Sequence, residues 1–128
     1  MQNDRRRLRV LVVDDNENAA RVLASLVTAW GYEARTAFNG LTAVIEATDF
    51  RPDVVLCDLA MPDIDGCKVA ENLRRHAALA GTLLVAVTAL DDDEHRRSAA
   101  RAGFHAHLVK PVDTEGLQRL LSVQAANI

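Results

Sequence analysis

Five polar residues each follow a short apolar run, although they lie far apart in the sequence: Asp14, Asp15, Asp58, Thr88 and Lys110. If the chain brings them together, these carboxylates, the hydroxyl and the ammonium group could carry out phosphoryl transfer. Three carboxylates repel one another, so such a cluster needs positive charge nearby. Lys110 supplies one unit of it. We predict that Mg²⁺ supplies the rest, because this ion suits a site with a few carboxylates, several waters and phosphate oxygens.

Asp58 is the predicted nucleophile of this cluster. Its carboxylate would attack phosphorus in line and become an acyl phosphate. The metal and Lys110 would offset the charge on the equatorial oxygens, while Thr88 would donate a hydrogen bond to one of them. We therefore predict that Asp58, Lys110 and Thr88 carry the chemistry.

The apolar runs before these residues are typical of strands that are covered on both faces. We expect strands over residues 8–13, 33–38, 54–57, 83–87 and 106–109. Five stretches with helical periodicity alternate with them, which predicts one doubly wound α/β domain with a parallel sheet and helices on both faces. Ligands of such sheets bind outside the carboxyl ends of the strands. The five polar residues should therefore meet at one edge.

The helices have recognisable faces and ends. The first has an apolar stripe that ends at Trp30, before the stop signal Gly31. The stripe of the second comprises Leu41, Val44, Ile45 and Thr48. For the fourth helix, Asp91 and Glu94 have the spacing of a capping box and Gly103 ends it, and Asp113 can cap the fifth.

We expect a flexible basic arm over residues 1–7, the domain over 8–122 and a C-terminal tail over 123–128.

The composition is that of a single globular domain. The chain has 128 residues, of which 49% are hydrophobic and 26% charged, a balance that excludes disorder. Its net charge of −3 argues against a dedicated binder of nucleic acid or anionic membranes. Cys57 and Cys67 form neither a disulfide framework nor a zinc spacing, and there is no signal-peptide pattern. We expect a cytoplasmic protein that binds no nucleic acid directly and no membrane.

Four motifs in order, VLVVDDN (10–16), VVLCDLAMPDIDG (54–66), VAVTAL (85–90) and AGFHAHLVKPV (102–112), make the chain resemble the receiver domain of bacterial response regulators. The resemblance implies a flavodoxin-like (βα)5 fold with strand order 2-1-3-4-5. It implies that Asp58 is the phosphoacceptor and that Mg²⁺ is held by Asp14, Asp15, Asp58 and the backbone carbonyl of Ala60. It also implies a cis peptide bond between Lys110 and the following proline.

The same resemblance implies partners and a switch. The phosphodonor would be a sensor histidine kinase or a histidine phosphotransfer protein. Thr88 would be the switch hydroxyl and would relay phosphorylation to the face built from the fourth helix, the fifth strand and the fifth helix. A downstream protein would bind this face, and phosphorylation can promote a homodimer through it. The second switch position, usually Tyr or Phe, is His107 here. Ala60 and Leu90 flank the phosphoryl group and are apolar, which predicts slow self-dephosphorylation.

Two other functions compete with this signalling role, in which the chain catalyses only its own phosphorylation and dephosphorylation. One is a Mg²⁺-dependent phosphohydrolase that turns over small phosphoesters through an aspartyl phosphate. Phosphatases of the haloacid-dehalogenase type, however, need a second aspartate two residues after the nucleophile, where this chain has Ala60. The other is an interaction scaffold that is never phosphorylated. It is disfavoured because the whole acidic cluster, Thr88 and Lys110 are present.

Overall fold

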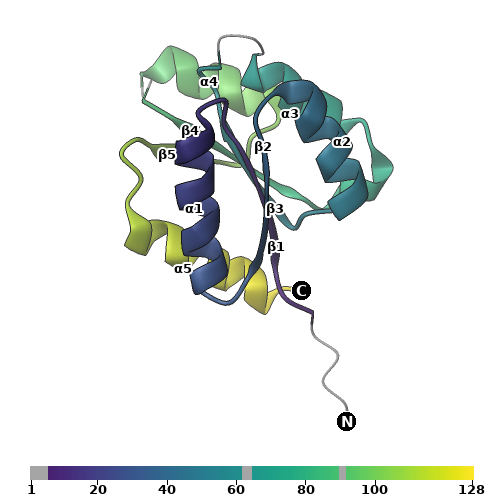
Figure 1. The fold of residues 1–128 in the computed structure, drawn as a ribbon. Helices are drawn as coiled ribbons and strands as arrows, with labels where there is room; N and C mark the ends of the chain where they lie inside the picture. The colour runs from purple at the N-terminus through teal and green to yellow at the C-terminus, as the bar shows by residue number, and fades with distance from the viewer. Residues whose placement is uncertain (1–5, 62–64, 90–91) are drawn as a thin grey trace.

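The structure, a computed structural model, describes residues 6–61, 65–89 and 92–128. Its centre is a five-stranded parallel sheet in the order β2-β1-β3-β4-β5 (Figure 1), so the predicted strand order is confirmed. The strands are β1 (Arg9–Val13), β2 (Glu33–Ala37), β3 (Val54–Asp58), β4 (Leu83–Thr88) and β5 (Ala106–Val109).

Helices cover both faces of this sheet. They are α1 (Glu17–Ala29), α2 (Gly40–Phe50), α3 (Gly66–Arg74), α4 (Asp93–Ala102) and α5 (Thr114–Ala126), with a short 3-10 helix, η1 (Ala77–Leu79), before β4. Helices α1 and α5 lie on one face, and α2, α3 and α4 lie on the other (Figure 1). The doubly wound (βα)5 fold is therefore confirmed.

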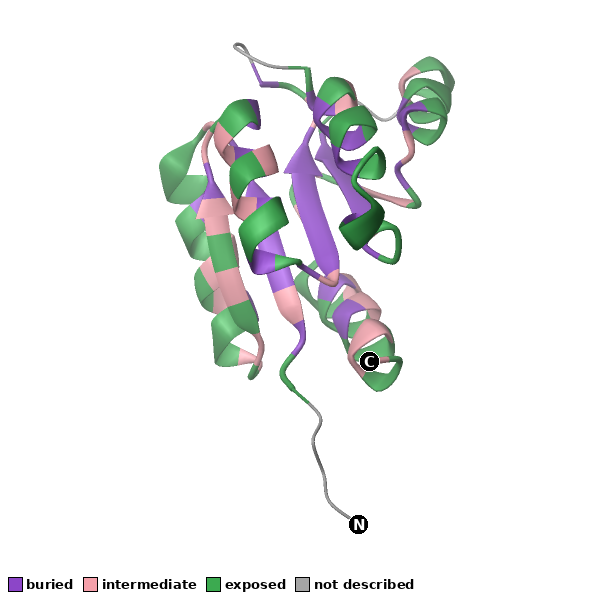
Figure 2. Cartoon of the chain, turned by 90° about the vertical axis from the view of Figure 1, so that its right-hand side faces the viewer, coloured by how far each residue is buried: buried purple, intermediate pink, exposed green. Residues whose placement is uncertain are grey.

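Burial on both faces explains why the strands are continuous apolar runs. In β1, Leu11 and Val13 belong to the core beneath α2, α3 and α4, whereas Val10 and Val12 belong to the core beneath α1 and α5. Successive side chains of a strand point to opposite faces, so both sets must be apolar when both faces are covered. Figure 2 shows the result, with buried inner strands between helices that are exposed on their outer sides.

The second helix packs through a different face from the one predicted. Leu41 and Ile45 of the predicted stripe are 70% and 59% exposed, whereas Ala43, Ala47 and Phe50 are buried against the sheet. Two small alanines let the helix backbone approach the sheet closely, so the bulkier aliphatic side chains are left on the outside. The predicted helix is confirmed, but of its apolar stripe only Val44 packs against the core.

Helix ends follow the expected chemistry with two corrections. Asp113 caps α5 by accepting a hydrogen bond from the backbone N–H of Glu115 at 3.1 Å, as predicted. The cap of α4 is Asp92, whose Oδ1 accepts from the backbone N–H of His95 at 2.8 Å, and the predicted cap, Asp91, lies outside the described residues. Helix α5 continues to Ala126, so residues 123–126 are helical and not part of a tail.

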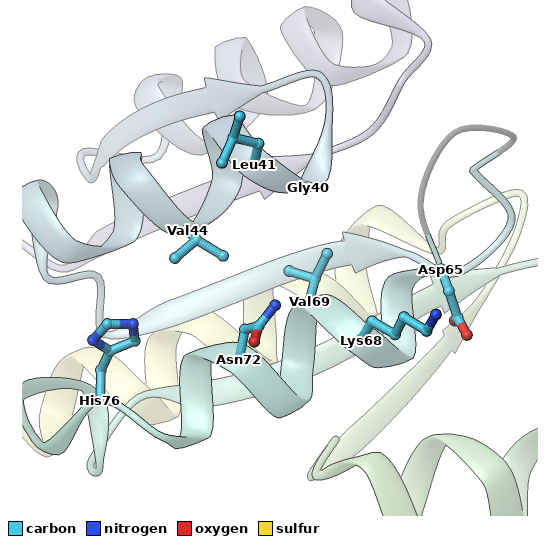
Figure 3. A pocket seen from close by; sticks show the side chains of 8 residues that line it. All are labelled: Gly40, Leu41, Val44, Asp65, Lys68, Val69, Asn72 and His76. Atoms are coloured by element: carbon cyan, nitrogen blue, oxygen red, sulfur yellow. The ribbon is translucent and has the colours of Figure 1, made fainter.

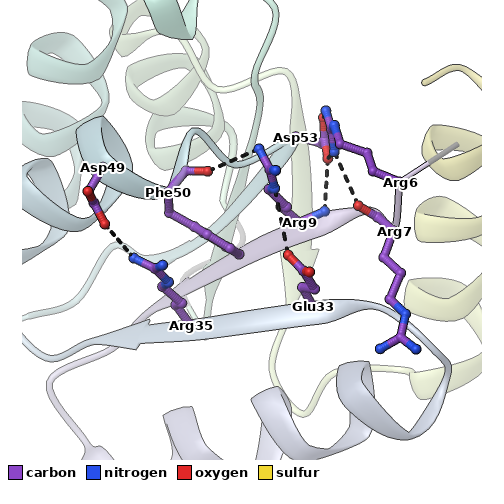
Figure 4. A network of polar contacts seen from close by, with 8 residues as sticks. All are labelled: Arg6, Arg7, Arg9, Glu33, Arg35, Asp49, Phe50 and Asp53. Atoms are coloured by element: carbon purple, nitrogen blue, oxygen red, sulfur yellow. Dashed lines mark hydrogen bonds and ion pairs between the residues drawn. The ribbon is translucent and has the colours of Figure 1, made fainter. Parts of the chain in front are cut away.

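An ion pair holds the end of the expected N-terminal arm. The guanidinium of Arg6 donates two hydrogen bonds of 2.7 Å to Asp53, and the backbone N–H of Arg9 donates a third of 2.8 Å (Figure 4). Arg6 is therefore fixed to the start of β3, whereas residues 1–5 of that arm lie outside the described residues. Burial alone would raise the pKa of Asp53, but these hydrogen bonds outweigh burial and hold the pKa below its usual value.

Asp53→Asn should lower the free energy of unfolding at pH 7 by about 1 kcal/mol, a figure that allows for solvent screening of Arg6. Because the pKa of Asp53 is lower in the folded than in the unfolded chain, the carboxylate stabilises the fold above about pH 4, and this contribution disappears as the pH falls through the folded-state pKa. Urea denaturation at pH 7 and pH 3 checks this. The control is Asp49→Asn, which removes an exposed ion pair with Arg35. An equal loss at both pH values would contradict the expectation.

Candidate functional site

The register of the sheet brings the ends of β1 and β3 side by side. Val13 pairs with Cys57 in neighbouring parallel strands, so the next residues, Asp14 and Asp58, emerge at the same edge. The backbone N–H of Asp14 donates to the carbonyl of Ala37 at 3.1 Å, which ties the end of β1 to the end of β2. The position of both carboxylates is therefore set by the sheet.

The predicted acidic cluster forms at this edge. Asp14, Asp15 and Asp58 each offer a carboxylate oxygen, and these oxygens lie within 4.8 Å of one another. Asp14 and Asp58 are only 7% and 6% exposed. Anionic groups so close together and so poorly hydrated repel one another strongly, so the cluster is suited to bind a cation.

Lys110 reaches the cluster from the end of β5. Its Nζ lies 3.1 Å from Oδ2 of Asp58 and 3.4 Å from Oδ2 of Asp14. Its backbone N–H donates to the carbonyl of Thr88 at 2.9 Å, and the peptide bond to Pro111 is cis, as predicted. Lys110 therefore joins the two most buried carboxylates of the cluster.

The charge of Lys110 is stabilised by this setting. Burial alone would lower the pKa of the ammonium group, but the hydrogen bond to Asp58 and the charges of Asp58 and Asp14 outweigh burial, and the pKa lies above its usual value. The amine therefore stays protonated at neutral pH and remains a fixed positive charge beside Asp58.

Backbone donors orient the two buried carboxylates. The N–H of Asn16 donates to Oδ1 of Asp14, and the N–H of Ala60 donates to Oδ1 of Asp58, both at 3.0 Å. Oδ1 of Asp58 thus faces the backbone at Ala60, and Oδ2 faces Lys110. The carboxylate of Asp58 is held in one orientation by donors on both sides.

Thr88 and His107, the predicted switch residues, lie at different places. Thr88 is completely buried at the end of β4. His107 lies on β5 and lines a cavity of about 300 Å³ between α4 and β5, together with Arg96 and Phe104. It is therefore on the predicted output side and not in the acidic cluster. Leu90, predicted to flank the phosphoryl group, lies outside the described residues.

Gly66, which the sequence predicts at the entry to a helix, also shapes the site. A Cβ built on Gly66 would lie 2.7 Å from the carbonyl oxygen of Asp58 and 3.0 Å from Cα of Leu59. Only glycine lets α3 begin this close to the backbone of Asp58. The sequence signal was the glycine itself, twelve positions after the start of β3, at the predicted entry to a helix.

The cluster fits Mg²⁺. Its donors are carboxylate oxygens, the hard ligands that Mg²⁺ prefers, and they come together at the end of two strands with one side exposed, since Asp15 is only partly buried. A fixed ammonium group next to the carboxylates limits the charge that a metal must neutralise. We find no mismatch between these residues and the predicted ion.

The fold and the acidic cluster together are those of a receiver domain of two-component signalling. The chain belongs to the response regulator receiver domain family, whose profile matches residues 10–122. It is 36% identical over 121 residues to the regulatory protein AtoC of Escherichia coli, covering 91% of this chain and 26% of AtoC. It is 30% identical over 118 residues to PilH of Pseudomonas aeruginosa, covering 92% of this chain and 98% of PilH. The chain thus spans about a quarter of AtoC and nearly all of PilH.

Solved structures agree with this assignment. The chemotaxis protein CheY4 of Vibrio cholerae superposes with a TM-score of 0.87 at 27% identity, covering 92% of this chain and 98% of CheY4. The receiver domain of the sensor histidine kinase PA1611 of Pseudomonas aeruginosa superposes with a TM-score of 0.84 at 26% identity, covering 94% of this chain and 99% of that domain. That domain has a magnesium ion coordinated in its active-site cleft.

In the described part of this chain, no helix is long and apolar enough to cross a membrane.

Cys57, directly before Asp58, should be chemically inert in the native protein. It is 1% exposed, and burial raises the pKa of its thiol far above the usual value; Cys67 is only partly buried. Since the thiolate is the reactive form, we expect a thiol reagent to modify Cys67 alone until the protein is unfolded. Cys67→Ser should then show no native reactivity. Rapid modification of Cys57 in the folded chain would contradict its burial.

Proposed function

We propose that this chain is a phosphoacceptor signalling domain, in which Asp58 accepts a phosphoryl group from a phosphohistidine in a Mg²⁺-dependent reaction. The observation that carries the proposal is the 3.1 Å contact between Nζ of Lys110 and Oδ2 of Asp58, inside a cluster of three carboxylates. A carboxylate that only stabilised the fold would need no such neighbours.

The transfer needs one bond to form and one to break. An oxygen of the Asp58 carboxylate attacks phosphorus in line, the phosphorus–nitrogen bond to the donor imidazole breaks, and the imidazole nitrogen keeps the electron pair and takes up a proton. Bound Mg²⁺ would supply positive charge to the phosphoryl oxygens and would be held by Asp14, Asp15, Asp58 and the carbonyl of Ala60. The attacking species is a carboxylate, which carries no proton to remove, so the step needs no base.

Lys110 and Thr88 act on the phosphoryl group both during and after its transfer. Lys110 pairs with one oxygen in place of its present contact with Asp58, and the Thr88 hydroxyl donates a hydrogen bond to another. Movement of Thr88, coupled to His107, alters the surface formed by α4, β5 and α5. This change would shift an existing conformational equilibrium and so affect the binding of a downstream protein or a second copy of the chain.

The partners follow from this chemistry. The donor is a sensor histidine kinase or a histidine phosphotransfer protein, and the chain catalyses only its own phosphorylation and dephosphorylation. Both cysteines are free thiols, which supports a reducing compartment, and we place the protein in the cytoplasm. We expect no direct contact with nucleic acid or membrane.

Incubation with Mg²⁺ and acetyl phosphate tests the proposal. We expect at most one phosphoryl group per chain by intact mass spectrometry, no labelling without Mg²⁺, and none in Asp58→Asn. Continuous release of phosphate over many turnovers would support the alternative phosphohydrolase. Absence of labelling in the folded wild-type chain would support the scaffold. Either result would overturn the signalling proposal.

The phosphoryl group on Asp58 should be long-lived. Ala60 is exposed two residues after Asp58 and offers no polar side chain to orient an attacking water. We expect Ala60→Asn to shorten the phosphoryl lifetime by about tenfold, because one net hydrogen bond to the attacking water is worth about 1.4 kcal/mol of the barrier. Ala60→Gly, the control, should change it little. Decay is followed by intact mass spectrometry after removal of the donor, and an unchanged lifetime in Ala60→Asn would rule out this explanation.

A further inference from the structure

A groove runs between α2 and α3 on the face of the molecule formed by α2, α3 and α4. It has a volume of about 510 Å³. Figure 3 shows Val44 of α2 and Val69 of α3 pointing toward each other across the groove, with Asn72 directed into it. The acidic cluster is not part of it. We call this feature the α2–α3 groove, and the proposed function does not use it.

Exposed aliphatic side chains of α2 lie at and beside the groove. Leu41, which lines the groove, is 70% exposed, and Ile45, one turn further along the same helix, is 59% exposed. The side chain of Val44 lies beside them and is partly buried against the core. Single exposed aliphatic residues are common on protein surfaces, but adjacent ones beside a groove mark an interaction surface.

The α3 rim of the groove is cationic. Lys68 stands at one end, and its ammonium group forms no ion pair with the described residues. At the other end, Nη1 of Arg75 donates a 3.3 Å hydrogen bond to Oδ1 of the groove residue Asn72, which holds the guanidinium beside the groove. His76 lines the same end.

The acidic residues near the groove are already engaged. Asp65 lines it, but its carboxylate caps α3 by accepting from the backbone N–H of Cys67 at 2.9 Å. On α2, Glu46 and Asp49 pair with Arg35 of β2 at 3.4 Å and 2.9 Å. Lys68 and Arg75 outnumber Asp65 on the rim, so the groove combines an apolar wall with a rim that carries an excess of positive charge.

We propose that the α2–α3 groove binds an amphipathic helix of a partner protein, with aliphatic side chains on one face and carboxylates beside them. The aliphatic residues would cover Leu41, Val44 and Ile45, and the carboxylates would pair with Lys68 and Arg75. Helix α3 (Gly66–Arg74) rises about 12 Å at 1.5 Å per residue, so the bound segment is at least about two helical turns long. Helix-in-groove recognition commonly uses apolar residues spaced by three and four positions.

A second copy of this chain fits the groove less well. If two copies paired through this face, each would bring its own cationic rim to the interface, with no free carboxylate row to meet it. The charge pattern therefore favours a different, acidic partner.

The test uses the full chain and a capped, fluorescein-labelled peptide of about fifteen residues, long enough to form helix, with leucines at i, i+4 and i+7 and glutamates on the flanks. Binding is measured by fluorescence anisotropy. We expect Leu41→Ser/Ile45→Ser to weaken binding at least tenfold and Lys68→Gln/Arg75→Gln to weaken it severalfold. Val22→Ser/Val123→Ser, which changes two aliphatic residues of similar exposure elsewhere, is the matched control and should bind normally.

A peptide with lysines in place of the glutamates should bind at least tenfold more weakly. Amide chemical shifts in ¹⁵N-labelled chain should move in residues 40–48 and 65–76 on addition of the acidic peptide. Equal binding of the two peptides, or shifts confined to α4, β5 and α5, would overturn the proposal. Concentration-dependent dimerisation in sedimentation that Leu41→Ser/Ile45→Ser abolishes would also overturn it, because the occupant would then be a second copy. None of these readouts requires phosphorylation of Asp58, so the outcome is independent of the proposed function.

Discussion

Lys110→Met should slow the Mg²⁺-dependent phosphorylation of Asp58 by about a hundredfold, the usual cost of losing one electrostatic group at a transferring phosphoryl group. In the structure the Lys110 ammonium lies 3.1 Å from Asp58 and 3.4 Å from Asp14. The environment of these carboxylates raises its pKa, so its charge is present throughout the neutral range. Methionine keeps much of the side-chain volume and removes the charge.

The rate is measured by intact mass spectrometry over time with acetyl phosphate and saturating Mg²⁺. Lys68→Met, which removes a lysine of the α2–α3 groove outside the cluster, is the matched control and should react at the wild-type rate. Circular dichroism confirms that each variant is folded. A Lys110→Met variant that is folded and reacts as fast as wild type would contradict the role given to this residue.

Gly66→Ala should both destabilise the fold and distort the site. The added Cβ would lie 2.7 Å from the Asp58 carbonyl and 3.0 Å from Cα of Leu59, and both are backbone atoms that cannot rotate away. Relief requires α3 or the segment after Asp58 to shift, and overpacking of this kind costs about 1–3 kcal/mol. The same shift moves the N–H of Ala60, which now orients the Asp58 carboxylate, so phosphorylation should also slow.

Gly81→Ala is the control for this substitution. Nothing lies within 4 Å of a Cβ built on Gly81, so we expect a change in unfolding free energy of less than about 0.5 kcal/mol. Urea denaturation of both variants provides the comparison. If Gly66→Ala proved as stable as Gly81→Ala, the result would contradict the close approach of α3 to the backbone of Asp58.

Much of the fold was predictable because each strand is covered on both faces and so reads as an unbroken apolar run. The run before Asp58 is an example, since all four residues of β3 that precede this aspartate are buried. The meeting of Asp14, Asp58 and Lys110 was likewise predictable, because parallel strands place their carboxyl ends at one edge. The distances between them depend on register and side-chain packing, which only the structure provides.

The wrong predictions have physical causes. Helical periodicity reveals that α2 has an apolar stripe, but it does not distinguish a core-facing stripe from an outward-facing one. In the structure the small side chains of Ala43 and Ala47 are the ones buried against the core. A run of acidic residues before α4 offers several possible caps, so Asp92 could not be singled out. The Arg6–Asp53 ion pair joins residues 47 positions apart and has no local signal.

The most direct test of the phosphoacceptor assignment is chemical mapping of the modified residue. The chain is incubated with acetyl phosphate and Mg²⁺, treated with borohydride, which reduces an acyl phosphate to an alcohol, and digested for peptide mass spectrometry. We expect homoserine at position 58 and at no other aspartate, and no homoserine when Mg²⁺ is chelated. Homoserine at position 14 or 15, phosphate retained on a histidine, or modification of Asp58 that is independent of Mg²⁺ would contradict our assignment.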